Sequence, residues 1–272
     1  MRYDLKEILE LAEAEGFAVP AFNVYNVETV MGVMEAAEET GAPVIFQMYS
    51  RLFDADLARF VAPAIMEAVE TMKVPAAFHL DHGAGVPQVL RALRYGATGV
   101  MIDASKEELD RNIAITKSVV DMAREVGVSV EGELGHVGFA KDGVSTDYTT
   151  VADASRFVEE TGVAALAVAV GTAHGHYKQA PVLALERIAE LHKDVNVHLV
   201  LHGGSGVPDD QIRASIEAGI RKVYFGTDLC CSFLDTVRKV DPSIIGIDTF
   251  MKEPVKAVKA FAIEKIKLLG AD

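Results

Sequence analysis

The chain has 272 residues, of which 50% are hydrophobic, and 40 acidic residues against 26 Lys and Arg give a formal net charge of −14. This acidic balance disfavours partners that attract clustered basic residues, so we expect neither a nucleic acid nor an anionic membrane as a partner. The length suits either one large α/β barrel or two small domains.

The apolar runs are only as long as strands, and the first residues include Asp4, Glu7 and Glu10. The sequence therefore predicts neither a membrane span nor a signal peptide. The only cysteines, Cys230 and Cys231, are neighbours. They offer no disulfide framework and suit a reducing compartment, so we expect a cytoplasmic protein.

Apolar runs alternate along the chain with stretches of helical spacing, beginning with Leu5, Ile8 and Ala12 before a stop at Gly16. Predicted strands cover residues 18–23, 43–48, 74–78 with its continuation to 82, 98–102, 128–133, 164–173, 197–201 and 222–227. Predicted helices cover residues 28–40, 55–72, 86–95, 105–125, 152–161, 182–192, 208–219, 229–239 and 254–269, the fourth starting from a capping box of Ser105 and Glu108. The aperiodic stretch 135–150 is predicted to be a functional loop.

Strands that alternate with helices pair in parallel through right-handed crossovers, and eight such units close into a (β/α)8 TIM barrel. An open doubly wound sheet is the alternative. Because no linker or composition break interrupts the chain, we expect residues 1–272 to form a single barrel domain with a C-terminal helical extension.

Three histidines follow apolar runs directly: His82, His174 and His202. In a closed parallel sheet they would meet at one rim, where three neutral imidazoles around an open fourth position make a catalytic zinc site. Alternatively, each is a lone histidine hydrogen-bonded at a strand end. Of the other histidines, we expect His79 and His198 in the core and leave His136, His176 and His192 outside the metal site.

Carboxylates accompany the predicted metal site. Asp81 precedes His82, so it is expected near the metal, where it could shuttle a proton to or from a substrate hydroxyl; orientation of a histidine is the alternative. Glu131 and Glu133 point to the same side of their strand because they are two residues apart. With Asp103 they could orient metal ligands, provide an alternate metal position or form ordinary salt bridges.

A phosphate site is predicted where glycine-rich turns meet helix N-termini. Residues 203–206 (GGSG) lead into a predicted helix, and residues 226–228 follow the eighth strand, the region where barrels often bind phosphate. Lys178 could reach the same anion, although a solvated surface lysine is the alternative. The predicted substrate-binding residues are Asn23, Gly175, Lys178, Gly203, Gly204, Ser205, Gly226, Thr227 and Asp228.

Several motifs, in this order, together resemble the class II, zinc-dependent ketose-bisphosphate aldolases, the fructose- and tagatose-bisphosphate enzymes. They are FNVYN at 22–26, HLDHG at 79–83, EGELG at 131–135, GTAHG at 171–175, HGGSG at 202–206 and TD at 227–228, and they span nearly the whole chain. The resemblance implies a dimeric or tetrameric barrel enzyme that reversibly cleaves a ketose phosphate, such as fructose or tagatose 1,6-bisphosphate, to dihydroxyacetone phosphate and an aldehyde.

The resemblance also implies roles for residues. One Zn²⁺ per subunit would be held by the histidines at 82, 174 and 202, with Asp81 exchanging the proton of the C4 hydroxyl. The dihydroxyacetone-phosphate end would be bound by Gly175, Gly203, Ser205 and Thr227, with a monovalent cation (Na⁺ or K⁺) nearby.

The chain departs from the family pattern on the aldehyde side. Lys141 stands where the family loop has a proton-transferring glutamate, Tyr224 replaces an asparagine, and the expected arginine is missing between Val240 and Lys252. We therefore expect an altered aldehyde partner. A non-catalytic sugar-phosphate-binding relative, favoured by Lys141, and another zinc-assisted sugar-phosphate enzyme on the same barrel are the alternatives.

Overall fold

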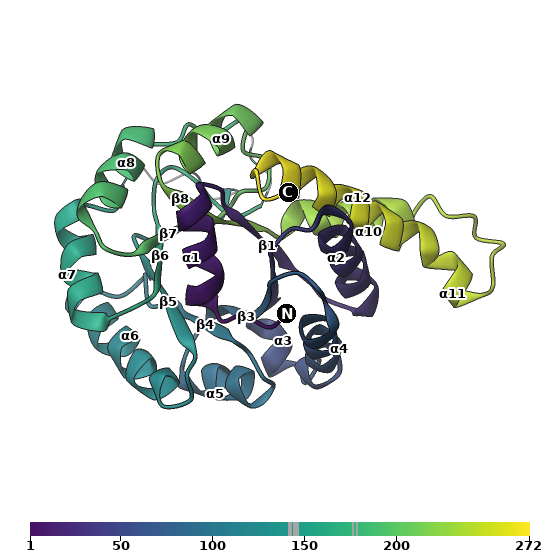
Figure 1. Ribbon diagram of the computed structural model, residues 1–272, viewed down its shortest axis with the longest axis horizontal. Helices are drawn as coiled ribbons and strands as arrows, with labels where there is room; N and C mark the ends of the chain where they lie inside the picture. The colour runs from purple at the N-terminus through teal and green to yellow at the C-terminus, as the bar shows by residue number, and fades with distance from the viewer. Residues whose placement is uncertain (141–142, 144–146, 176, 178) are drawn as a thin grey trace.

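In this computed structural model, residues 1–140, 143, 147–175, 177 and 179–272 are described. Eight parallel strands pair in sequence order, and the first also pairs with the last, which closes the sheet (Figure 1). The strands are β1 (Val19–Asn23), β2 (Val44–Tyr49), β3 (Ala76–Gly83), β4 (Gly99–Ile102), β5 (Ser129–Leu134), β6 (Ala165–Val168), β7 (His198–Leu201) and β8 (Ile220–Phe225). The closed sheet confirms the predicted (β/α)8 TIM barrel, and the alternative of an open doubly wound sheet is wrong.

Helices alternate with these strands and surround them (Figure 1). They are α1 (Leu5–Glu15), α2 (Val27–Thr40), α3 (Arg51–Asp54), α4 (Ala58–Thr71), α5 (Val86–Arg94), α6 (Leu109–Arg124), α7 (Val151–Thr161), α8 (Leu185–Asp194), α9 (Asp209–Glu217), α10 (Thr227–Val237), α11 (Ile247–Phe250) and α12 (Lys252–Leu268). Among the described residues, no helix is long and apolar enough to cross a membrane.

Three local predictions were wrong. The capping box does not form, because the Ser105 hydroxyl bonds Asp103 at 2.7 Å and α6 starts after Glu108 without a side-chain cap. The strand expected over 164–173 ends at Val168. The Ala169 N–H is shared between the last carbonyl of β5, Leu134, at 3.4 Å and the Thr149 hydroxyl at 2.9 Å, and the Ala169 carbonyl accepts from the Thr149 N–H, so the loop residue Thr149 takes over from the strand. The helix expected from residue 182 begins at Leu185.

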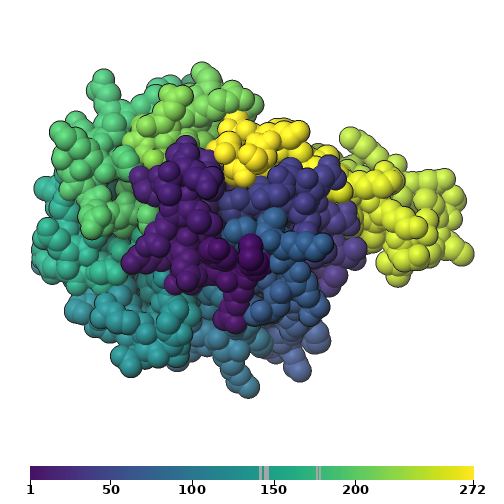
Figure 2. Space-filling model, viewed as in Figure 1, coloured from purple at the N-terminus to yellow at the C-terminus, as the bar shows by residue number. Residues whose placement is uncertain are grey.

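α1 closes the N-terminal end of the barrel. Its apolar face, with Leu5, Ile8 and Leu9 fully buried, lies against the starts of the strands, and Figure 1 shows it crossing the open end. The Leu5 N–H donates to the carbonyl of Thr98, just before β4. In Figure 2 the atoms of this segment cover the same face. The opposite, C-terminal end is therefore the one left for a functional site.

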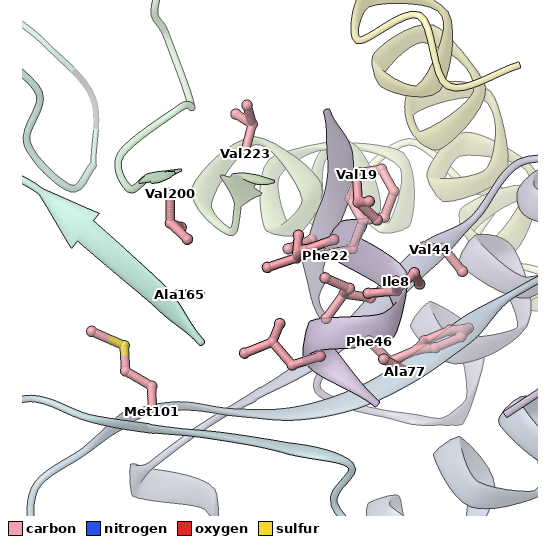
Figure 3. Close-up of a cluster of buried hydrophobic side chains, with 14 of the residues drawn as sticks. Ile8, Val19, Phe22, Val44, Phe46, Ala77, Met101, Ala165, Val200 and Val223 are labelled. Carbon is pink, nitrogen blue, oxygen red and sulfur yellow. The ribbon is translucent and has the colours of Figure 1, made fainter. Parts of the chain in front are cut away.

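The outer face of the sheet is mostly apolar, whereas its interior combines apolar side chains with a row of polar ones. Phe22 and Phe46, two of the core side chains labelled in Figure 3, pair in register with each other, and Phe46 pairs with Phe78 of β3. Phe22 also packs edge-on to Phe261 of α12 at 6.2 Å. Strand side chains alternate between faces. The adjacent register row, Asn23–Gln47–His79, therefore faces the barrel interior, where all its members are fully buried.

The C-terminal segment packs on α2 and then projects from the barrel. Figures 1 and 2 show α11 and the loop before it standing away from the rest of the molecule. α12 returns to α2 and meets it at Gly32, where an added Cβ would lie 2.7 Å from Val258 and 2.9 Å from the Val255 carbonyl. The absent side chain at position 32 thus permits the close approach of the two helices.

Replacing Gly32 by Ala tests this approach. In an ordinary helix interior the change stabilises by roughly 0.5–1 kcal/mol. Here we expect the free energy of unfolding to fall by about 1–3 kcal/mol because the methyl group overpacks the α2–α12 contact. Denaturant unfolding measures this free energy. Met31→Ala, at an exposed position on α2, is the control. A more stable Gly32→Ala chain would contradict the packing argument.

Candidate metal centre and active site

Three histidines from separate βα connections meet at the C-terminal end of the barrel. His82 lies near the end of β3, His174 follows β6, and His202 directly follows β7. One ring nitrogen of each lies within 4.8 Å of the others, a spacing that a single metal ion can bridge. The structure thus brings together the three residues that the sequence singled out as metal ligands.

His82 is held by its backbone and by a carboxylate. It has φ +48°, in the left-handed region that non-glycine residues rarely adopt, so the surrounding structure imposes its conformation. Its Nδ1 lies 2.9 Å from Asp103 Oδ2. A carboxylate only accepts, so Nδ1 carries a proton, and in the neutral ring the lone pair is on Nε2, 3.0 Å from His202 Nδ1.

Glu131 orients His202, whose protonated nitrogen is Nε2, whereas that of His82 is Nδ1. Its Nε2 lies 2.8 Å from Glu131 Oε1, and Lys222 Nζ donates to Glu131 Oε2 at 2.6 Å, with all three side chains fully buried. Burial alone would raise the pKa of Glu131, but the Lys222 charge and the His202 hydrogen bond hold it well below its usual range. The ionised carboxylate therefore fixes the proton on Nε2 and leaves Nδ1 facing His82.

The donor set fits a divalent metal such as zinc. Two imidazole lone pairs that face each other at 3.0 Å repel unless a cation or proton lies between them. Burial disfavours charge on His82, but nearby carboxylates, Asp81 foremost, raise the pKa of His82 to about 10. Burial and the other two histidines lower the pKa of His174 to about 2, and its buried Nε2 lacks a hydrogen-bond partner among the described residues. The site thus favours one added positive charge, and a metal ion that displaced the proton of His82 would find three imidazole nitrogens to hold it.

Glu133 forms a second potential metal group with His82 and Asp103, whose ligand atoms also lie within 4.8 Å of one another. Burial raises the pKa of Glu133. Its Oε1 accepts from the Val137 N–H at 3.1 Å, and its Oε2 lies 3.8 Å from His82 Nδ1. The expectation that Glu131 and Glu133 share one side of β5 is confirmed, because both contact the histidine cluster.

Asp81 lies beside the histidines with one oxygen held and the other open. Oδ2 accepts from Asn23 Nδ2 at 2.8 Å, and Asn23 Oδ1 accepts from Gln47 Nε2 at 2.9 Å. Oδ1 is buried, lies 3.9 Å from His82 Nε2 and has no hydrogen-bond partner among the described residues. Asn23, predicted to bind substrate, here positions Asp81 and also donates to Tyr224 Oη at 2.9 Å.

The glycine-rich turns after β7 and β8 lie against each other. The Asp228 N–H donates to Ser205 Oγ, and the Gly206 N–H donates to Asp228 Oδ2, each at 3.2 Å. Gly203 has φ +68°, and a Cβ there would lie 2.4 Å from the Ala173 carbonyl, so only glycine fits. The remaining predicted phosphate residues in the described chain also lie on these turns or on the connection after β6: Gly175, Gly204, Gly226 and Thr227.

An open cavity of about 620 Å³ reaches from the histidines to the turn after β8, with His82, His174, Gly175, Gly226 and Thr227 among its lining residues. Lys178, expected at the phosphate, lies outside the described residues, as do Lys141 and His176. The cavity therefore joins the potential metal position to part of the predicted substrate site.

Sequence reasoning missed three positioning residues. Lys222 was treated only as part of a strand, although its inward register, shared with Tyr224 two residues later, was a usable signal. Gln47 supports Asn23. The Tyr177 hydroxyl lies 2.6 Å from the Ala173 carbonyl and 2.9 Å from that of Gly203, tying the connection after β6 to the one after β7.

Known proteins share this architecture. The YdjI aldolase from Escherichia coli K12 is 34% identical, with a TM-score of 0.92 over 100% of this chain and 98% of that one. A putative fructose-1,6-biphosphate aldolase from Coccidioides immitis is 27% identical, with a TM-score of 0.89 over 97% and 95% of the two chains. Fructose-bisphosphate aldolase from Campylobacter jejuni, at 22% identity, a TM-score of 0.83 and coverage of 99% and 96%, shares the fold.

The family model described as fructose-bisphosphate aldolase class-II matches residues 3–272. Enzymes of this family generally use Zn²⁺, in keeping with the histidine cluster. The match runs through every strand of the barrel and every residue of the cluster. The chain accordingly belongs to the class II fructose-bisphosphate aldolases and is a carbon–carbon lyase of that family.

Proposed function

We propose that the chain is a zinc-dependent aldolase that reversibly cleaves a ketose phosphate to dihydroxyacetone phosphate and an aldehyde. The observation that carries the proposal is the convergence of three imidazole nitrogens within 4.8 Å beside a buried carboxylate oxygen without a partner in the described chain. Fructose or tagatose 1,6-bisphosphate is the reference substrate, and the departures at Lys141 and Tyr224 support an aldehyde other than glyceraldehyde 3-phosphate.

In this proposal His82, His174 and His202 hold the zinc. When bound, zinc supplies Lewis-acid stabilisation of the negative charge that develops on the ketose oxygen. The chain's own contribution to bond cleavage is Asp81: its Oδ1 takes the proton of the C4 hydroxyl while the C3–C4 bond breaks. The Asn23 hydrogen bond to Oδ2 keeps the carboxylate oriented during this transfer. The C4 oxygen then becomes the aldehyde, C3 takes a proton from solvent to complete dihydroxyacetone phosphate, and Asp81 releases the C4 proton to solvent.

The phosphate of that product is proposed to bind at the turns of residues 203–206 and 226–228. Their support is the pairing of the Gly206 and Asp228 N–H groups with side chains of the opposite turn, which brings the N-terminus of α10 beside the glycine-rich turn. We extend the proposal to a monovalent cation near this anion, and to His82, Asp103 and Glu133 as an alternate metal position. Release of dihydroxyacetone phosphate from a panel of ketose phosphates, with and without a chelator, tests the proposal.

Replacing His174 by Ala removes one ligand of the proposed zinc. Losing even an outer partner of a ligand commonly costs 10–100-fold in metal affinity, so we expect losses above about 100-fold in both metal retention and cleavage. Metal analysis of the purified chain and dihydroxyacetone-phosphate release measure them. His192→Ala, on α8 away from the site, is the matched control. Full zinc content in His174→Ala would remove this residue from the ligand set.

Replacing Asp81 by Asn separates proton transfer from metal binding. Asn keeps a side-chain oxygen that can accept from Asn23 but loses the basic carboxylate, so we expect zinc to stay bound and cleavage to fall roughly 10²–10⁴-fold. Exchange of the C3 proton of dihydroxyacetone phosphate with D₂O, followed by NMR, should persist because the C4 hydroxyl is not involved. Cleavage near the wild-type rate would end the proposed role of Asp81.

We also propose a homodimer or homotetramer. The support is the projecting segment around α11 (Figure 2), where Ile245 and Ile247 are 95% and 75% exposed and would be covered by a second copy of the chain. Light scattering of the purified chain should give a multiple of the 29.2 kDa monomer mass. The double change to Glu at both positions should lower that mass, and a wild-type mass of one chain would refute the assembly.

A further inference from the structure

The cavity continues past the histidines to an arginine at the end of β2. Arg51, the first residue of α3, lines the same cavity as His82. Its guanidinium carbon lies 5.5 Å from the ring centre of Tyr25 and 5.2 Å from that of Tyr49. The Tyr49 ring in turn lies 6.1 Å from the His82 ring, so a single aromatic ring separates the guanidinium from the histidine cluster.

Arg51 faces this cavity without a salt bridge in the described part of the chain. Its natural partner, Asp54 at i+3, is already engaged: Gln88 Nε2 and Arg91 Nη2 each donate to it at 2.6 Å. Asp103, which follows β4 and lines the same cavity, is held by His82 and Ser105. A chain with a net charge of −14 thus leaves a guanidinium at its active-site cavity uncompensated by these carboxylates.

The two tyrosines make this guanidinium a pre-organised site. Contact with aromatic rings holds the long arginine side chain in place, while its planar fork of N–H donors remains available to bind carboxylate or phosphate oxygens in pairs. Asp103, Lys106 and Glu107 also line this cavity; Asp103 is paired with His82, and Lys106 and Glu107 are sequence neighbours of opposite sign. Arg51 therefore brings to the cavity a positive charge with which neither Asp103 nor Glu107 forms a salt bridge.

We infer that Arg51, seated between Tyr25 and Tyr49, binds an anionic group, phosphate or carboxylate, at the aldehyde end of the substrate. The inference rests on the proposed aldolase function, which places dihydroxyacetone phosphate at the turns of residues 203–206 and 226–228 and leaves the Arg51 side for the other half of the ketose. Arg51 then sets specificity by selecting aldehydes that carry a negative charge.

The kinetic test is condensation of dihydroxyacetone phosphate with a neutral, a phosphorylated and a carboxylated aldehyde: glyceraldehyde, glyceraldehyde 3-phosphate and tartronate semialdehyde. In Arg51→Met we expect the ratio of kcat/KM for the preferred anionic aldehyde over glyceraldehyde to fall roughly 10- to 100-fold, the usual effect of losing a charge-assisted pair. Arg51→Lys should restore part of the ratio. The wild-type preference between the last two aldehydes distinguishes phosphate from carboxylate.

Arg59→Met is the matched control, because Arg59 also lies over an aromatic ring, Phe60 at 5.2 Å, but is not among the residues lining the cavity. It should leave the ratio unchanged. An equal loss on neutral and anionic aldehydes in Arg51→Met would indicate a merely structural role and overturn the inference, as would an unchanged ratio.

A binding measurement keeps this result separate from the fate of the proposed function. Calorimetric titration with fructose 1,6-bisphosphate and fructose 1-phosphate compares ligands that differ by one terminal phosphate. If the wild-type chain binds the bisphosphate more tightly than fructose 1-phosphate, and this difference is lost in Arg51→Met, the result supports the anion site. It does so even if no condensation is detected, because a lack of condensation would refute only the aldolase proposal. Equal loss of affinity for both ligands, or no loss, overturns the role of Arg51.

Discussion

One buried carboxylate fixes the orientation of His202 within the histidine cluster. Glu131 receives His202 Nε2 at 2.8 Å on one oxygen and Lys222 Nζ at 2.6 Å on the other, inside the barrel. Burying ions costs several kcal/mol each unless partners compensate, and here the lysine charge does so. The result is a carboxylate that stays ionised and an imidazole with a fixed tautomer. Without Lys222, Glu131 would favour its neutral form, and His202 would lose the acceptor that aims Nδ1 at His82.

This arrangement is possible because the outer face of the sheet packs against the helices, whereas the inner face lines the barrel. The Phe22–Phe46–Phe78 row packs outward against the helices, where apolar burial stabilises the fold. Inward positions can therefore be polar: Asn23, Gln47 and His79 pair in register, and Glu131 reaches the same interior, with Oε2 3.4 Å from His79 Nε2. α1 covers the N-terminal end, so this polar interior meets solvent only at the C-terminal end, where the histidines lie.

The sequence predicted the barrel and the rim residues because both are local signals: apolar runs separated by glycine stops, and polar residues directly after those runs. It missed Lys222 as a partner of Glu131, because the two residues are 91 positions apart and only strand register shows that they share the interior. The Ser105 capping box failed for a similar reason, since Asp103 and His136 compete for the hydroxyl. β6 was predicted too long because an apolar run continues after its strand partners end.

Tyr224 shows how a departure from the family pattern is accommodated. Its ring stacks on His202 at 5.3 Å with an interplanar angle of 5°, and its hydroxyl lies 2.9 Å from Asn23 Nδ2. Burial raises the pKa of Tyr224 well above its usual value, so it remains neutral beside Asp81. The tyrosine thus keeps a polar contact to Asn23 while filling more of the rim than an asparagine would. With Tyr25 and Tyr49 around Arg51, it gives the cavity an aromatic wall next to the proposed metal. In the proposed aldolase reaction, such a wall would select the aldehyde by shape as well as by charge.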